Sequence, residues 1–270
     1  MKKVKSYIYL VILSVISVPA LARTVLPETT IPGTELGIQY SDYKYQETVN
    51  GAFFMSNKGN KIGLTWTSIS DEIGKDWHAI WDLRYAFGDD TYNSASGTGT
   101  APDRLWDLRI MAGKDHINQD QDFVLFTFGG LAYRTLTNDL RKVGPGGYRR
   151  VSEYFYVPLG ITFRNRISSD TRISTSIEYD YFVKGSQLSQ LSDINPALND
   201  LKNNQTKGYG YRATITYEKP QWSVGLFYYY WNIGASDFGT VTLIDGTPIG
   251  IGQEPKNDTK ELGIELKRRF

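Results

Sequence analysis

The segment WHAIWDLRYAF, residues 77–87, decides the fold class because its side chains alternate in character from one residue to the next. Trp77, Trp81 and Phe87 share one parity with other apolar or aromatic residues, whereas Asp82 and Arg84 have the opposite parity. Successive side chains of a β-strand point to opposite faces. The segment therefore predicts a strand with one apolar face and one polar face.

Similar segments recur along the chain and bring the number of predicted strands to ten. Clear alternation is found in residues 105–112, 151–163, 173–183, 209–217 and 259–270. Strands with less certain facing are predicted for residues 36–45, 61–69, 123–135 and 222–233. Both a soluble β-sandwich and a membrane β-barrel would produce this pattern, because each has one apolar face per strand.

The connections between the strands distinguish the two architectures, because short and long connections alternate strictly. The short ones are residues 70–75, 115–121, 165–171 and 219–221, and the long ones are residues 46–60, 88–103, 138–150, 185–207 and 235–258. Membrane barrels have short periplasmic turns and longer extracellular loops, whereas a Greek-key sandwich has no reason to alternate. The sequence predicts an all-β, antiparallel up-and-down transmembrane barrel with about ten strands and five long extracellular loops.

The first 22 residues match a signal peptide. Lys2, Lys3 and Lys5 precede an apolar stretch at residues 8–18, and Ala20-Leu21-Ala22 forms a small-residue cleavage site. The apolar stretch is shorter than the roughly 20 residues of a membrane-spanning helix. We expect residues 23–34 to be a periplasmic N-terminal tail, residues 35–270 to be the barrel, and the protein to reside in the cell outer membrane.

Composition excludes several classes of function. The chain has no Cys, which rules out a disulfide-stabilised secreted domain and any thiol chemistry. Its 30 basic and 29 acidic residues show no clustered basic face of the kind that binds nucleic acid. No cofactor or metal site is predicted, since His78 with Asp76 nearby is too small a ligand set.

The last nine residues, LGIELKRRF, place Leu262, Ile264, Leu266 and Phe270 on one face. This ending resembles the terminal strand of Gram-negative outer-membrane proteins, although Arg268 stands where those proteins have an apolar residue. The resemblance implies that Leu266 and Phe270 belong to a C-terminal signal read by the barrel-assembly machinery. It also implies outer-membrane lipids and lipopolysaccharide as partners.

Enzymatic activity is not expected. The ten-stranded omptin proteases use a His and several Asp at the extracellular rim, but the two histidines here, His78 and His116, are predicted at the periplasmic end. The sequence also predicts no base and nucleophile positioned together, as an outer-membrane phospholipase A or a lipid A deacylase would require.

Charged residues of the polar parity are the main candidate site, because in a barrel they point into the lumen. They are Asp82, Arg84, Asp107, Arg109, Arg164, Glu178, Asp180, Arg212, Glu261, Glu265 and also Lys267. One interpretation is a set of ion pairs that fills a narrow barrel, and the other is a polar conduit. The sequence favours a surface-exposed structural or interaction protein with a mostly filled lumen, whose long loops contact a surface ligand. The alternative is a narrow porin for small polar solutes.

The large aromatic residues are predicted to face lipid or to form interfacial girdles. They are Trp77, Trp81, Trp106, Trp222 and residues 228–231. A sugar-stacking patch near the loops is the alternative.

Overall fold

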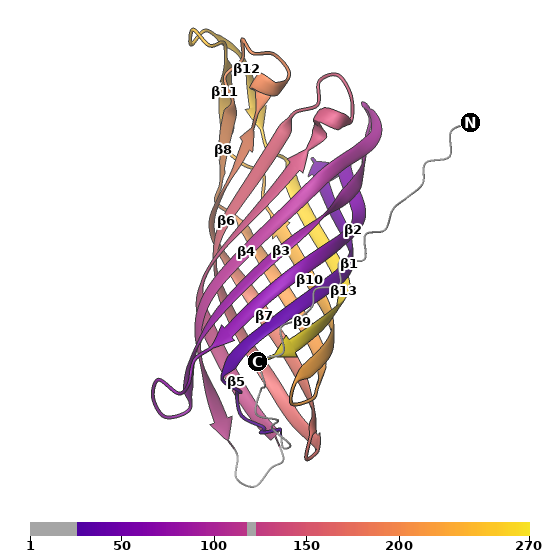
Figure 1. The fold of residues 1–270 in the computed structure, drawn as a ribbon. Coiled ribbons are helices and arrows are strands. Elements are labelled where there is room, and N and C mark those ends of the chain that lie inside the picture. Colours follow the sequence, from indigo (N-terminus) through magenta and orange to yellow (C-terminus); the bar gives the residue numbers. More distant parts are fainter. Residues whose placement is uncertain (1–25, 118–122) are drawn as a thin grey trace, which may run out of the picture.

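The computed structural model describes residues 26–117 and 123–270, which form a closed antiparallel β-barrel (Figure 1). The predicted signal peptide, residues 1–22, lies outside the described residues. The wall consists of β1 (Gly33–Val49), β2 (Ala52–Ile69), β3 (Trp77–Ser94), β4 (Gly97–Ile117), β5 (Phe123–Asp139), β6 (Arg149–Ser168), β7 (Thr171–Ser189), β8 (Leu201–Gln205), β9 (Gly208–Glu218), β10 (Trp222–Ile233) and β13 (Lys256–Arg269).

The predicted fold class and strand number are confirmed. Both β8 and β9 pair with β7, so together they occupy one position in a wall of ten strands. The wall closes where β1 pairs with β13, from Glu35 opposite Arg269 to Thr48 opposite Lys256. Among the described residues, closure gives every strand of the wall except β8 a paired neighbour on each side. We call the end where β1 begins and β13 ends the terminal end, and the opposite end the distal end.

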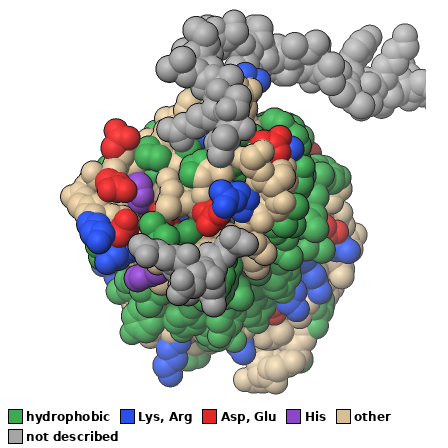
Figure 2. Space-filling view, turned by 90° about the horizontal axis from the view of Figure 1, so that it is seen from below, with side chains coloured by type: hydrophobic (Ala, Val, Ile, Leu, Met, Phe, Trp, Pro, Cys, Tyr) green, Lys and Arg blue, Asp and Glu red, His purple; other side chains and the backbone are tan. Residues whose placement is uncertain are grey.

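Side chains of the wall divide as the alternation predicts, with apolar residues outside and polar residues inside. Ile177, Leu226 and Leu262 point outward and are each about 60% exposed. Seen from below, hydrophobic side chains cover much of the visible wall, and charged side chains gather on the end face (Figure 2). An outer apolar band of this kind matches the lipid-facing surface of a membrane barrel.

The expectation of five long loops is wrong for the first two, because the strands continue through them. Residues 46–60 contain the end of β1 and the start of β2, and residues 88–103 contain the hairpin between β3 and β4. β4 alone has 21 residues, whereas about 9–11 residues suffice to cross a bilayer. Beyond Phe87 the outward positions of β3 become polar (Asp89, Thr91 and Asn93). The barrel therefore extends beyond its apolar band at the distal end.

The turn between β1 and β2 explains why no loop is needed there. Asn50 and Gly51 have positive φ angles of 51° and 80°, which suit a two-residue type I′ turn and match the twist of the flanking strands.

The other three distal connections contain additional structure. The 3₁₀ turn η1 (Leu140–Lys142) follows β5, and η2 (Leu191–Asp193) follows β7. The hairpin of β11 (Phe238–Thr242) and β12 (Pro248–Gln253) stands above β8 at the distal end (Figure 1). Its glycines Gly239 and Gly252 pack closely on Leu201, where an added Cβ would lie 2.5–2.6 Å from that side chain. Among the described residues, no helix is long and apolar enough to cross a membrane.

Candidate functional site

All eleven charged residues singled out in the sequence lie on the inward face of the barrel. Ten of them form two clusters of ion pairs and hydrogen bonds, and the ring of Tyr229 faces Arg84 of one cluster and Arg212 of the other. β3 supplies Asp82 and Arg84, β4 supplies Asp107 and Arg109, β7 supplies Glu178 and Asp180, β9 supplies Arg212, and β13 supplies Glu261, Glu265 and Lys267. We call these ten residues the mid-barrel network. Arg164 on β6 lies apart from it, towards the terminal end.

Arg212 is the centre of the mid-barrel network. Its guanidinium is 2.6 Å from Asp107, 2.9 Å from Asp180 and 3.2 Å from Glu178. It also donates a hydrogen bond of 2.6 Å to the hydroxyl of Tyr156, which in turn donates to Asp107 at 2.6 Å. One guanidinium thus contacts three buried carboxylates. The attraction between these opposite charges offsets the desolvation free energy of each group.

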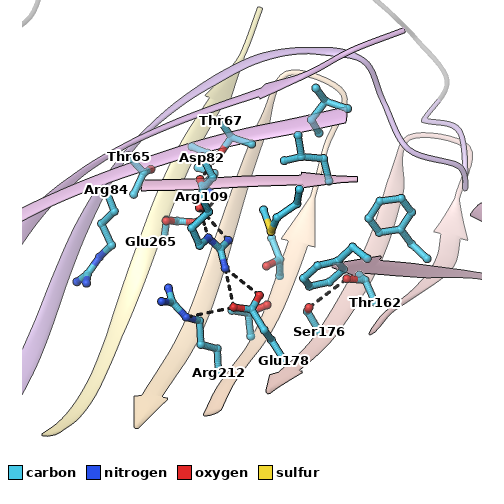
Figure 3. A pocket seen from close by; sticks show the side chains of 18 of the residues that line it. Thr65, Thr67, Asp82, Arg84, Arg109, Thr162, Ser176, Glu178, Arg212 and Glu265 are labelled. Carbon is cyan, nitrogen blue, oxygen red and sulfur yellow. Dashed lines mark hydrogen bonds and ion pairs between the residues drawn. The ribbon is translucent and has the colours of Figure 1, made fainter. Parts of the chain in front are cut away.

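Two further arginines form ion pairs across the lumen, and Figure 3 shows those of Arg109. Arg109 is 2.8 Å from Asp82 on the neighbouring strand and 2.7 Å from Glu178. Arg84 forms an ion pair with Glu261. β4 and β7 are separated in the wall by β5 and β6, and β3 and β13 by β2 and β1. These pairs therefore cross the interior of the barrel.

Four inward residues near the network were not recognised in the sequence. Lys61, Arg134, Tyr156 and Trp231 are each no more than 1% exposed. Lys61 is 2.8 Å from Asp90 and 3.5 Å from Asp103. The prediction that residues 228–231 face lipid is wrong for two of them. Tyr229 lines the lumen, where Arg84 and Arg212 lie over its ring. Trp231 is fully buried in the lumen and packs against Tyr154 and Tyr156. Because residues 222–233 are apolar on both parities, alternation alone gave no facing for this strand.

A chamber of about 230 Å³ lies between the network and the terminal end. One part of its lining is apolar and includes Ile80, Met111 and Phe126. Another part carries hydroxyl groups, including those of Thr67, Thr162 and Ser176 (Figure 3). The chamber is therefore amphipathic, with the ion pairs of Arg109 at its boundary.

The described part of the N-terminal tail binds across the terminal end of the lumen. The backbone N–H of Thr30 donates to Asp115 at 2.7 Å, and Asp115 also pairs with Arg164 at 2.7 Å. Arg172 donates to the carbonyls of Pro27 and Thr29 at 2.7 and 2.8 Å. Leu26 and Ile31 are buried in the same segment. We call residues 26–32 the N-terminal strap.

Both histidines lie near the terminal end. The Nδ1 atom of His78 is 3.0 Å from the carbonyl of Ser70, and the Nε2 atom of His116 is 2.9 Å from the hydroxyl of Thr127. Within residues 26–117 and 123–270, no three His, Cys, Asp or Glu side chains come together as a metal site.

Comparison with known proteins supports the fold. No protein-family model matches the chain, and no curated protein matches it in sequence. The outer membrane protease OmpT from Escherichia coli matches in structure with a TM-score of 0.53 at 12% identity, covering 88% of this chain and 97% of OmpT. The outer membrane protein OprG from Pseudomonas aeruginosa matches with a TM-score of 0.38 at 10% identity, covering 88% of this chain and 97% of OprG. The chain has the fold of bacterial outer-membrane β-barrel proteins.

Proposed function

We propose that the protein is an integral outer-membrane barrel whose lumen is closed and whose distal end is an extracellular interaction surface. The observation that carries this proposal is the set of ion pairs that cross the lumen between strands that are not neighbours. Arg109 joins β4 to β7, Arg212 joins β9 to β4, and Arg84 joins β3 to β13. Solute passage would require these pairs to separate.

The energetics favour a closed lumen. Separating one partner from a buried ion pair leaves an uncompensated charge and costs about 3–5 kcal/mol. Arginine side chains span a ten-stranded lumen easily, since the lumen is only somewhat wider than that of a filled eight-stranded barrel. The N-terminal strap adds a second closure at the terminal end.

Membrane placement follows from the outer surface. The apolar band faces lipid, the terminal end faces the periplasm, and the polar distal extension faces the outside with lipopolysaccharide around it. Leu266 points outward and is about half exposed, and Phe270 ends the chain beside the start of β1. Their placement on an outward strand end suits recognition by the barrel-assembly machinery.

A narrow porin is the second candidate, and two cavities favour it. The chamber of about 230 Å³ lies on one side of the mid-barrel network. A vestibule of about 660 Å³ opens at the distal end. In this alternative the network is a selectivity barrier between two water-accessible spaces.

Conductance in planar bilayers separates the two functions. A closed barrel gives no reproducible single-channel step in the wild type. The Arg109→Ala/Arg212→Ala variant that also lacks the N-terminal strap, residues 26–32, gains a step. The matched control is Lys202→Ala, because Lys202 lies outside the lumen in an exposed pair with Glu153. A wild-type step that changes in Arg84→Ala or Arg109→Ala would support the porin and refute the closed barrel.

A further inference from the structure

The distal vestibule has walls that suit the apolar part of a ligand. It encloses about 660 Å³, within the usual range of small-molecule sites. Its lining includes Phe54, Met55, Tyr92, Leu201 and Val241. The β11–β12 hairpin covers one side through the close contact of Gly252 with Leu201. Polar side chains line the rest of the vestibule, among them Thr98, Asn203 and Gln253.

The acidic groups in the vestibule are two glutamates that share the same donors. Glu47 at the end of β1 and Glu254 after β12 both accept from the same nitrogen, Nη2, of Arg150. The hydroxyl of Tyr45 lies 2.8 Å from Glu47 and 3.1 Å from Glu254. A phenol has only one proton to donate, so it cannot satisfy both carboxylates at once.

Charge in the vestibule is unbalanced. Glu47 and Glu254 are its acidic lining residues, and Arg150 is its only basic residue among the described lining residues. All three are more than nine-tenths buried, at 1%, 5% and 7% exposure. When both carboxyl groups are ionised, the group carries one excess negative charge in a poorly solvated place, where a positive partner is worth more than in water.

An independent observation also indicates a missing partner. Asn257 lies directly opposite Glu47 in the β1–β13 pairing and is 3% exposed. Neither its amide oxygen nor its amide nitrogen has a hydrogen-bond partner among the described residues, and the same is true of Nε of Arg150. Buried polar atoms in native proteins are normally paired, so unpaired atoms on Arg150 and on the residue opposite Glu47 leave places that a ligand or ordered water can fill.

We propose that the vestibule binds a small organic cation, an amine or guanidinium with an apolar body, whose charged group pairs with the carboxyl groups of Glu47 and Glu254 from the vestibule side. The apolar body packs on the vestibule walls near Tyr92, where a ring face also attracts a cation. This inference rests on the proposed surface-interaction function and specifies the chemistry of the ligand.

Proton and ligand compete for the same pair of carboxyl groups. Burial and the neighbouring Glu47 raise the pKa of Glu254 to about 8, although Arg150 and the hydroxyl of Tyr45 lower it. At neutral pH the pair therefore holds a proton that a bound cation would displace. Linkage requires that cation binding releases a proton near pH 7 and becomes tighter as the pH rises through about 8.

Calorimetric titration of the full barrel in detergent tests the site with three probes of similar shape. Phenethylamine is the cation, 2-phenylethanol is neutral, and 3-phenylpropionate is the anion. We expect phenethylamine to bind at least 10-fold more tightly than the other two, with proton uptake by the buffer. In Glu254→Gln and Glu47→Gln this preference falls at least 10-fold, whereas the exposed Glu153→Gln control leaves it unchanged.

Two results would overturn the inference: equal binding of the three probes, or an unchanged preference in both vestibule variants. Heat-modifiable migration of each variant on a gel shows whether the barrel has folded. If the probes show no preference for the cation and the wild-type barrel shows no conductance, the cation site is refuted and the closed-barrel function is retained. A conducting wild type would instead refute that function, whatever the probes show.

Discussion

Replacement of Arg212 by Met tests the mid-barrel network most sharply, because it removes the charge and retains most of the side-chain volume. The guanidinium is 7% exposed and contacts Asp107, Asp180 and Glu178. Without it, Glu178 keeps Arg109 and Asp107 keeps Tyr156, but Asp180 keeps no ion pair among the described residues. One orphaned buried charge costs about 3–5 kcal/mol of unfolding free energy.

The assay is denaturant unfolding of the barrel in phospholipid vesicles, followed by tryptophan fluorescence. The control is Lys202→Met, which breaks an exposed pair with Glu153 and should cost less than about 1 kcal/mol. The Arg212→Met/Asp180→Asn double variant should recover part of the loss, because the orphaned charge is gone. A loss for Arg212→Met no larger than that of the control would refute a buried network.

Three further predictions address the membrane surface, the strap and the distal end. Ile177→Arg on the outward face should lower the free energy of unfolding in vesicles by about 2–4 kcal/mol. Ile251→Arg on β12 should lower it by less than about 0.5 kcal/mol. Equal losses in the two variants would contradict the position of the apolar band. Arg172→Ala should make the N-terminal strap several-fold more sensitive to added protease than wild type, and an unchanged cleavage rate would refute the closure. The pKa of Glu254 rises from 4.5 to about 8 on folding, so its stabilising effect is present below pH 4.5 and is lost as the pH rises through about 8; unfolding measured across this range should show the loss, and Glu254→Gln should abolish it.

The lipid-embedded halves of the strands could be predicted because the two faces of each strand meet different surroundings. In residues 77–87 the outer side chains meet lipid and the inner ones meet the polar lumen, so the sequence alternates. Beyond Phe87, Asp89 points outward and Asp90 inward, and both are polar. A strand with polar groups on both sides shows no alternation between apolar and polar residues. The sequence therefore predicts loops where the structure has the distal extension of the wall. Asn50-Gly51 was the turn signal that could have revealed it.

The facing of the charged residues was predictable, but their pairing was not. Parity alone places Arg109 and Glu178 inside the barrel. Their contact depends on the stagger between β4 and β7, which are separated by two strands, and periodicity within one strand contains no such information. The facing of Trp231 could not be predicted because β10 is apolar on both sides. The outer face of β10 is part of the apolar band, and Trp231 on its inner face packs on Tyr154 and Tyr156.

Labelling of single-cysteine variants in whole cells tests the central claim most directly, since the chain contains no Cys. Ala95 lies in the β3–β4 turn at the distal end, and Glu72 lies in the β2–β3 turn at the terminal end; both are exposed. An outer-membrane barrel in the proposed orientation predicts that a membrane-impermeant maleimide labels Ala95→Cys in intact cells. Glu72→Cys should be labelled only after the outer membrane is permeabilised. Labelling of Glu72→Cys but not Ala95→Cys in intact cells, or equal labelling of both, would contradict the account.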